Sequence, residues 1–133
     1  MKYLLDAWAV LAWLQEESGH LRVDALIRKA RNKEVNLILG IVNFGEVFYT
    51  YAKTRGIEEA KRAEQLLRLL PINIVAPVEE KLVMSAAHLK ALYPVSYADA
   101  FAAALTEKEK AILVTGDTDF KKVEKRIKIE WLR

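Results

Sequence analysis

Short apolar segments alternate with longer amphipathic segments along the whole chain. The short segments are rich in Val, Ile and Leu, have the length of buried strands, and cover residues 2–5, 35–39, 72–75, 111–115 and 127–131. Between them, apolar residues recur with helical spacing at residues 7–16, 20–33, 43–55, 57–70, 78–92 and 97–110. Parallel strands need crossovers of this length. The pattern therefore predicts an α/β fold, a three-layer α/β/α sandwich around a mostly parallel five-stranded sheet.

Capping and breaking residues predict several element ends. Ser18, Asn43 and Ser96 can accept backbone N–H bonds as helix N-caps, and Gly40 marks a loop. Three breakers follow the segments that they end: Gly56, Pro71 and Pro94. Residues 117–126 fit either a short helix or an irregular crossover.

Composition points to one domain spanning residues 1–133. No linker or internal repeat divides the chain, and 53% hydrophobic residues can form a core without disulfides. Asp6 interrupts the apolar start that a signal peptide needs, and no apolar stretch has the length of a membrane-spanning helix. The absence of Cys suits a reducing compartment, so we expect a soluble cytoplasmic protein. The net charge of +3 is compatible with a polyanionic partner but does not select one.

Carboxylates follow two predicted strands at the point where each ends. Asp6 directly follows the first strand, Asp117 follows the 111–115 strand, and Asp119 comes two residues later. Ligand sites of open parallel sheets form beyond the carboxyl ends of the strands. Taken alone, Asp6 or Asp117 is equally well explained as a residue that ends a strand and caps a helix.

Two further acids interrupt apolar helix starts. Glu46 lies between Gly45 and Val47, and Asp99 lies among Ala residues in the first turn after Ser96. A carboxylate in such surroundings must be solvated at a cleft or paired with a cation, because burying it bare is costly. Like charges that converge from several elements call for a divalent cation, and oxygen ligands suit Mg²⁺ or Mn²⁺. Metal-assisted cleavage of a phosphodiester follows from such a site.

The order of these motifs resembles the PIN domain family, specifically its small VapC-type toxins, over essentially the whole chain. The motifs are Leu5-Asp6, Glu46 in a helix start, Ser96-Tyr97-Ala98-Asp99-Ala100, and Leu113-Val114-Thr115-Gly116-Asp117-Thr118-Asp119-Phe120. The resemblance implies a Mg²⁺- or Mn²⁺-dependent endoribonuclease with the catalytic set Asp6, Glu46, Asp99 and Asp117. Of these, Asp6, Asp99 and Asp117 are the implied metal ligands. The implied auxiliary residues are Asp119, Thr115 and Ser96.

The resemblance also implies partners. These are an RNA substrate, a second copy of the chain in a homodimer, and a cognate antitoxin that blocks the acidic cleft. A surplus of aromatic and apolar residues near Trp13 and Phe48 favours such a partner surface. Trp8 departs from the family pattern, in which a small Ser or Thr often stands close after the first Asp. Its bulk argues against a hydroxyl contact with Asp6 from this position.

Other functions remain open at this point. A receiver-type phospho-signalling domain also gathers carboxylates at strand ends, but it needs an acidic pair that Asp6 lacks. A PIN-like module that only binds proteins would not need the intact acidic set. The sequence does not separate a toxin from a stand-alone processing nuclease, and it does not identify the RNA.

Basic residues and histidines add little. One basic group flanks the final acidic motif and fits either an RNA backbone or a solvated surface: Lys121, Lys122, Lys125, Arg126 and Lys128. The same two interpretations hold for a second group: Arg22, Arg28, Lys29, Arg31 and Lys33. His20 and His88 lack a second ligand or nucleophile nearby in the sequence and receive no role.

Overall fold

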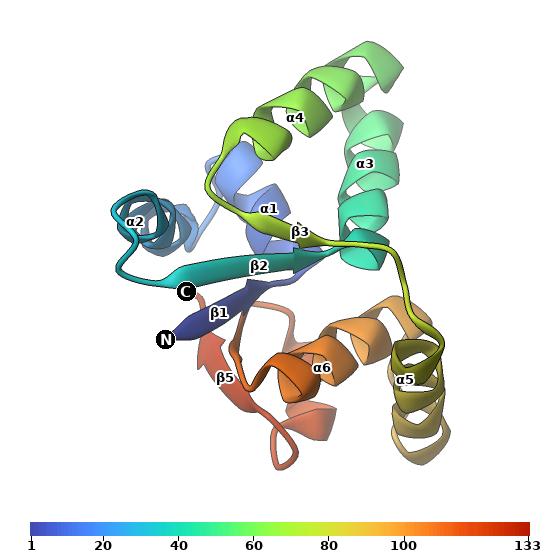
Figure 1. Cartoon of the computed structure of the whole chain (residues 1–133). Helices are drawn as coiled ribbons and strands as arrows, with labels where there is room; N and C mark the ends of the chain where they lie inside the picture. Colours follow the sequence, from blue (N-terminus) through green and yellow to red (C-terminus); the bar gives the residue numbers. More distant parts are fainter.

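The computed structural model describes residues 1–133 and forms a five-stranded sheet with helices on both faces (Figure 1). The strands are β1 (Lys2–Leu5), β2 (Asn36–Gly40), β3 (Asn73–Val75), β4 (Ile112–Thr115) and β5 (Lys128–Trp131). The helices are α1 (Ala7–Leu14), α2 (His20–Arg31), α3 (Ile41–Arg55), α4 (Ile57–Leu69), α5 (Glu80–Leu92), α6 (Tyr97–Glu109) and the 3-10 helix η1 (Thr118–Val123). The predicted α/β/α sandwich is confirmed.

Every strand pair in the sheet is parallel, and the strand order is β3-β2-β1-β4-β5. The first strand is therefore central, with β2 on one side and β4 on the other. Receiver domains use the order 2-1-3-4-5 instead. The receiver alternative is therefore wrong at the level of the fold.

Side-chain alternation along the strands divides the core between the two faces of the sheet. Leu4, Ile38 and Leu113 pack with α5, α6 and η1. Their neighbours Leu5 and Val114 pack with α1, α2 and α3 on the opposite face. Helices α3 and α4 pack together as a hairpin that extends to one side of the sheet (Figure 1).

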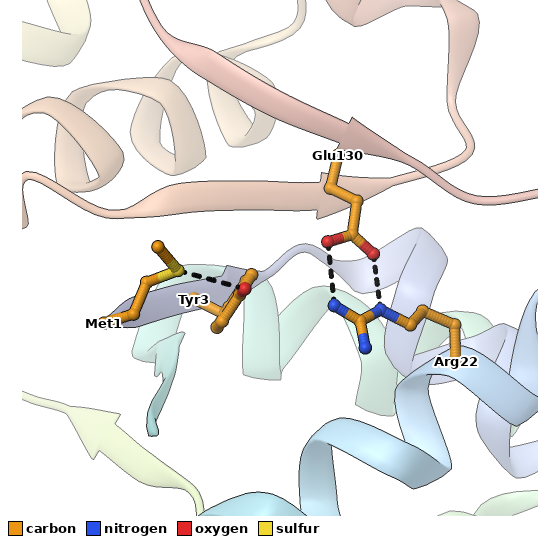
Figure 2. A network of polar contacts seen from close by, with 4 residues as sticks. All are labelled: Met1, Tyr3, Arg22 and Glu130. Atoms are coloured by element: carbon orange, nitrogen blue, oxygen red, sulfur yellow. Dashed lines mark hydrogen bonds and ion pairs between the residues drawn. The ribbon is translucent and has the colours of Figure 1, made fainter. Parts of the chain in front are cut away.

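A polar contact ties α2 to the last strand. Arg22 donates from Nε and Nη2 to the two carboxylate oxygens of Glu130, at 2.6 and 3.0 Å, as Figure 2 shows. The same guanidinium lies 5.9 Å from the centre of the Tyr3 ring. The Tyr3 hydroxyl donates to the Met1 sulfur at 3.1 Å (Figure 2). Arg22, one of the basic residues considered for RNA contact, thus has an internal partner.

Several predicted boundaries differ from the structure. Ser18 is not an N-cap, because Gly19 takes that position at the start of α2. Gly19 has a φ of 91°, and a Cβ added to it would lie 2.9 Å from Leu132 Cβ, so both its backbone and its surroundings favour glycine. Gly40 does not form a loop, because β2 leads directly into α3 with Gly40 as its N-cap. Asn43 therefore lies inside the first turn of α3 and does not cap it. Residues 118–123 of the undecided segment form η1.

The parallel strands gather three element starts at one edge of the sheet. Helices α1, α3 and η1 begin directly after β1, β2 and β4, or within a few residues of them. Helix α6 packs against β1, β2 and β4 and contacts α3. None of the helices combines the length and the apolar character that crossing a membrane requires.

Candidate metal centre

Asp6 is the most deeply buried of the predicted acids. It follows β1, caps α1 by accepting the Ala9 N–H at Oδ1 over 2.9 Å, and is 3% exposed. The Thr115 hydroxyl donates to Asp6 Oδ2 over 2.5 Å. The helix-capping role that a lone Asp6 would have is therefore present, but it uses only one of the two carboxylate oxygens.

Thr115 connects Asp6 to the segment that carries the next acid. This last residue of β4 is fully buried, and its Oγ1 also accepts the backbone N–H of Asp117 over 3.0 Å. Asp117 in turn accepts the Asp119 N–H at Oδ1 over 2.9 Å and caps η1. The adjacent strands β1 and β4 thus place Asp6 and Asp117 at the same edge of the sheet. The Thr115 hydroxyl links them, because it bonds to the Asp6 carboxylate and to the backbone N–H of Asp117.

Trp8 stands where the family pattern has a small hydroxyl residue, and its ring packs against the backbone beside Asp117. A Cβ on Gly116 would lie 2.3 to 2.6 Å from three atoms of the Trp8 ring. The absent side chain of Gly116 therefore makes room for the indole. Thr115 supplies the hydroxyl contact to Asp6 from β4 instead.

Asp99 lies in the first turn of α6, which brings it to the same edge of the sheet. Ser96 caps this helix, as predicted, by accepting the Asp99 N–H over 3.1 Å. The Asp99 side chain does not cap the helix, and it is 9% exposed. Carboxylate oxygens of Asp99, Asp117 and Asp119 can all lie within 4.8 Å of one another. Asp6 and Glu46 are not members of this compact group.

Three acids at this edge, Asp6, Asp99 and Glu46, have a raised pKa. Burial raises the pKa of Asp6 to about 7 and that of Asp99 to about 6. The Asp117 charge contributes to both increases and the Asp99 charge contributes to that of Asp6, whereas the Thr115 hydroxyl and the Ala9 N–H oppose the increase in the pKa of Asp6. Burial also raises the pKa of Glu46, and its bond from Asn43 opposes that shift.

Positive charge is scarce at this edge. Asp6, Glu46, Asp99 and Asp117 form no ion pair, and only Asp119 has a cationic partner, Lys122 Nζ at 3.7 Å. Converging carboxylates without counter-charges fit a hard divalent cation with oxygen ligands, such as Mg²⁺ or Mn²⁺. The donor set thus suits the metal that the sequence predicts.

Sequence reasoning missed the role of Asn43. Its Nδ2 donates to Glu46 Oε1 over 3.3 Å and to the Ala98 carbonyl over 3.1 Å. The signal was the spacing of three residues between Asn43 and Glu46, which places both on one face of a helix. The prediction that Asn43 is an N-cap placed it outside the helix, so this spacing was not considered.

Other residues singled out from the sequence lie in structural contacts. Trp13 Nε1–H donates to Asp24 Oδ1 over 3.2 Å and ties α1 to α2. Arg126 pairs with Glu107 of α6. Phe48 lines a groove of about 260 Å³ between α3 and α4, together with Ile41, Phe44, Gly45, Glu64 and Arg68.

Comparison with known proteins agrees with this arrangement. The sequence matches the PIN domain family over residues 3–126. No protein of curated function matches it.

Similar solved structures include VapBC2 from Rickettsia felis bound to a DNA fragment from their promoter (TM-score 0.76, 18% identity, 100% of both chains). VapC20 from Mycobacterium tuberculosis, a sarcin-ricin loop cleaving toxin, is also similar (TM-score 0.71, 16% identity, 91% of this chain and 94% of that chain). A toxin–antitoxin complex from Klebsiella pneumoniae follows (TM-score 0.57, 17% identity, 89% of each chain). At these identities the likeness concerns the fold. Because the family match covers nearly all of the strands and helices, the chain belongs to the PIN domain family.

Proposed function

We propose that this protein is a Mg²⁺- or Mn²⁺-dependent endoribonuclease. The observation that carries the proposal is the group of Asp99, Asp117 and Asp119 at the carboxyl edge of a PIN domain, next to Asp6 and Glu46 and with almost no counter-charge. Asp6, Asp99 and Asp117 would hold the metal, and Asp119 would assist. A bound divalent cation supplies Lewis-acid chemistry, neutralising phosphate charge and making water more acidic.

The protein's own residues have distinct tasks in this proposal. Thr115 keeps one Asp6 oxygen in place while the Ala9 N–H holds the other. Ser96 fixes the first turn of α6, which orients Asp99. Glu46 lies outside the compact group and has a raised pKa, so it would accept the proton of the attacking water. Four elements bring these side chains to one edge of the sheet: Asp6 follows β1, Thr115 ends β4, Asp99 lies in α6 and Glu46 lies in α3.

Cleavage assays test the proposal directly. The protein should cut single-stranded RNA in Mg²⁺ or Mn²⁺, stop in excess EDTA, and cut a DNA strand of the same sequence poorly. Asp117→Asn should be inactive, whereas Glu34→Gln, an exposed acid before β2, should match the parent. RNA cleavage by a contaminant-free preparation that is undiminished in EDTA would sink the idea.

We further propose that the nuclease is the toxin of a cytoplasmic toxin–antitoxin pair and forms a homodimer. The Klebsiella pneumoniae and Mycobacterium tuberculosis neighbours, a toxin–antitoxin complex and a toxin, support this proposal. The α3–α4 groove at Phe48 and exposed apolar residues on α4, including Leu66 and Leu69, offer a surface for such a partner.

The partner proposals have their own tests. Co-expression with the neighbouring reading frame should yield a complex in which cleavage is blocked, and light scattering of the protein alone should give twice the chain mass. Failure to co-purify would favour a stand-alone processing nuclease. A strict monomer at micromolar concentrations would contradict the dimer.

A further inference from the structure

Asn43 is a buried amide that joins two carboxylate-bearing helices. It lies in the first turn of α3 and is 2% exposed. Its Nδ2 amide group donates two hydrogen bonds, one to Glu46 on its own helix and one to the carbonyl oxygen of Ala98 in α6. Ala98 directly precedes Asp99. A single side chain therefore contacts one acid and the backbone beside another.

The Asn43 bridge holds together two helices whose acids, Glu46 and Asp99, carry like charges. The two carboxylates repel each other, and the Glu46 charge is one of those that act on Asp99. Helices α3 and α6 contact each other, and the side chain of Glu46 is long and half-buried. Without a donor, Glu46 could swing away from Asp99, and the two helices could separate by a small amount.

Few side chains could replace Asn43. A leucine fills a similar volume but donates no hydrogen bond, and a serine has one hydrogen for two acceptors. An aspartate would add another negative charge to a set that already repels itself. The two donors of one amide nitrogen match the two acceptors that the fold presents.

We propose that Asn43 is a positioning residue of the centre: by bridging Glu46 and the Ala98 carbonyl, it sets the distance and direction of Glu46 relative to Asp99. The proposal rests on the proposed nuclease function and adds a residue that acts through Glu46. Misplacement of a reacting group by about 1 Å can lower a rate by roughly a hundredfold. We therefore expect loss of Asn43 to affect the chemical step beyond its effect on stability.

The test compares Asn43→Leu with Thr106→Val. Thr106 is a matched control, because it is also buried and donates to a carbonyl of α6, Ala102, over 2.8 Å, without contacting any of the acids. Thermal unfolding in EDTA, Mn²⁺ affinity by calorimetry, and single-turnover RNA cleavage at saturating metal are measured for both. Both variants should unfold at lower temperature. Only Asn43→Leu should lower the cleavage rate, by about tenfold or more.

A second background shows whether Asn43 acts through Glu46. In Glu46→Gln protein, the loss caused by Asn43→Leu should shrink to that caused by Thr106→Val. Equal effects of the two variants on cleavage, or a full Asn43→Leu loss in the Glu46→Gln background, would overturn the proposal. If Asn43→Leu does not fold, Asn43→Ser is judged by the same criteria, with a smaller expected loss.

The nuclease proposal and this one can fail separately. If the parent binds Mn²⁺ but cuts no RNA, the Mn²⁺ affinity is compared instead. Asn43→Leu should weaken it more than Thr106→Val does, because Asn43 also holds the Ala98 carbonyl next to the proposed ligand Asp99. An equal Mn²⁺ affinity of the two variants would then overturn the role of Asn43. A parent that binds no Mn²⁺ would overturn both proposals.

Discussion

Asp99 combines burial, like-charged neighbours and the absence of a capping role. Because Ser96 caps α6, replacement of the Asp99 carboxylate removes charge without removing a cap. We expect metal-free Asp99→Asn to be as stable as the parent at pH 8, or more stable by up to about 2 kcal/mol. In the parent, folding raises the pKa of Asp99 to about 6, which means that the charged carboxylate is disfavoured in the folded state.

Thermal melts of parent and Asp99→Asn in EDTA and in Mg²⁺ test this prediction. Mg²⁺ should raise the melting temperature of the parent, because it binds the folded cleft only, and the variant should lose most of that gain. If Asp99→Asn were clearly less stable in EDTA and kept the full Mg²⁺ shift, Asp99 would not belong to the site.

Asp6 should make the metal-free protein more stable in mild acid than in base. Its pKa is 3.8 in the unfolded chain and about 7 when folded, so the folded state binds the proton more tightly. The resulting stability is fully present below pH 4 and is lost as the pH rises through about 7. We expect the free energy of unfolding of metal-free protein to fall between pH 5 and pH 8, by a few kcal/mol at most.

Asp6→Asn keeps a side-chain oxygen for the Ala9 N–H, presents an NH2 group to the Thr115 hydroxyl in place of Oδ2, and does not titrate. Denaturant unfolding at several pH values should therefore give a flatter pH profile for Asp6→Asn than for the parent. A parent whose stability rises between pH 5 and pH 8 would contradict the assigned burial of Asp6.

At the residue scale, the sequence was informative about which acids matter and less so about their environment. Asp6 and Asp117 could be placed together because carboxyl ends of parallel strands share an edge. The spacing of Asn43 and Glu46 was a readable signal, but the Thr115 bond to Asp6 and the Asn43 bond to the Ala98 carbonyl join residues distant in sequence, which no local pattern encodes. Whether Asp6 contacts the metal beside the compact group of Asp99, Asp117 and Asp119 stays a prediction.

At the scale of elements, Trp8 of α1 packs against Gly116, the residue that follows β4. We expect Gly116→Ala to destabilise the protein by roughly 1–3 kcal/mol, because the new methyl group would overlap the Trp8 ring. Gly45→Ala is the control, since nothing lies within 4 Å of its Cβ position in α3, and it should be neutral or stabilising.

Chemical denaturation of single and double variants measures this contact. The cost of Gly116→Ala should largely disappear in a Trp8→Leu background, where the ring is absent. An equal cost in both backgrounds would show that Gly116 is required for a reason other than the indole.

Element boundaries show where local signals compete with tertiary structure. Pro94 and Ser96 marked the loop before α6 and the start of that helix well, because both act through their own backbone or side-chain groups. Ser18 and Gly40 misled, because Gly19 packs against Leu132 and β2 runs into α3 without a loop. These outcomes depend on contacts distant in sequence.

At the scale of the whole molecule, the alternation of apolar segments and helical patterns was sufficient for the sandwich. The strand order was not readable in this way, because an alternating pattern is compatible with several parallel orders. The observed order puts β1 and β4 side by side, and this adjacency lets Thr115 reach Asp6. The acidic centre is therefore a consequence of the topology as well as of the motifs.

The central claim is that the carboxylates at this edge form one divalent metal site. Calorimetric titration of Mn²⁺ into metal-free parent, Asp117→Asn and Glu34→Gln tests it most directly. We predict saturable binding to the parent, an affinity at least about tenfold weaker in Asp117→Asn, and no change in Glu34→Gln. Mn²⁺ binding that is absent from the parent, or equally strong in Asp117→Asn, would contradict the claim.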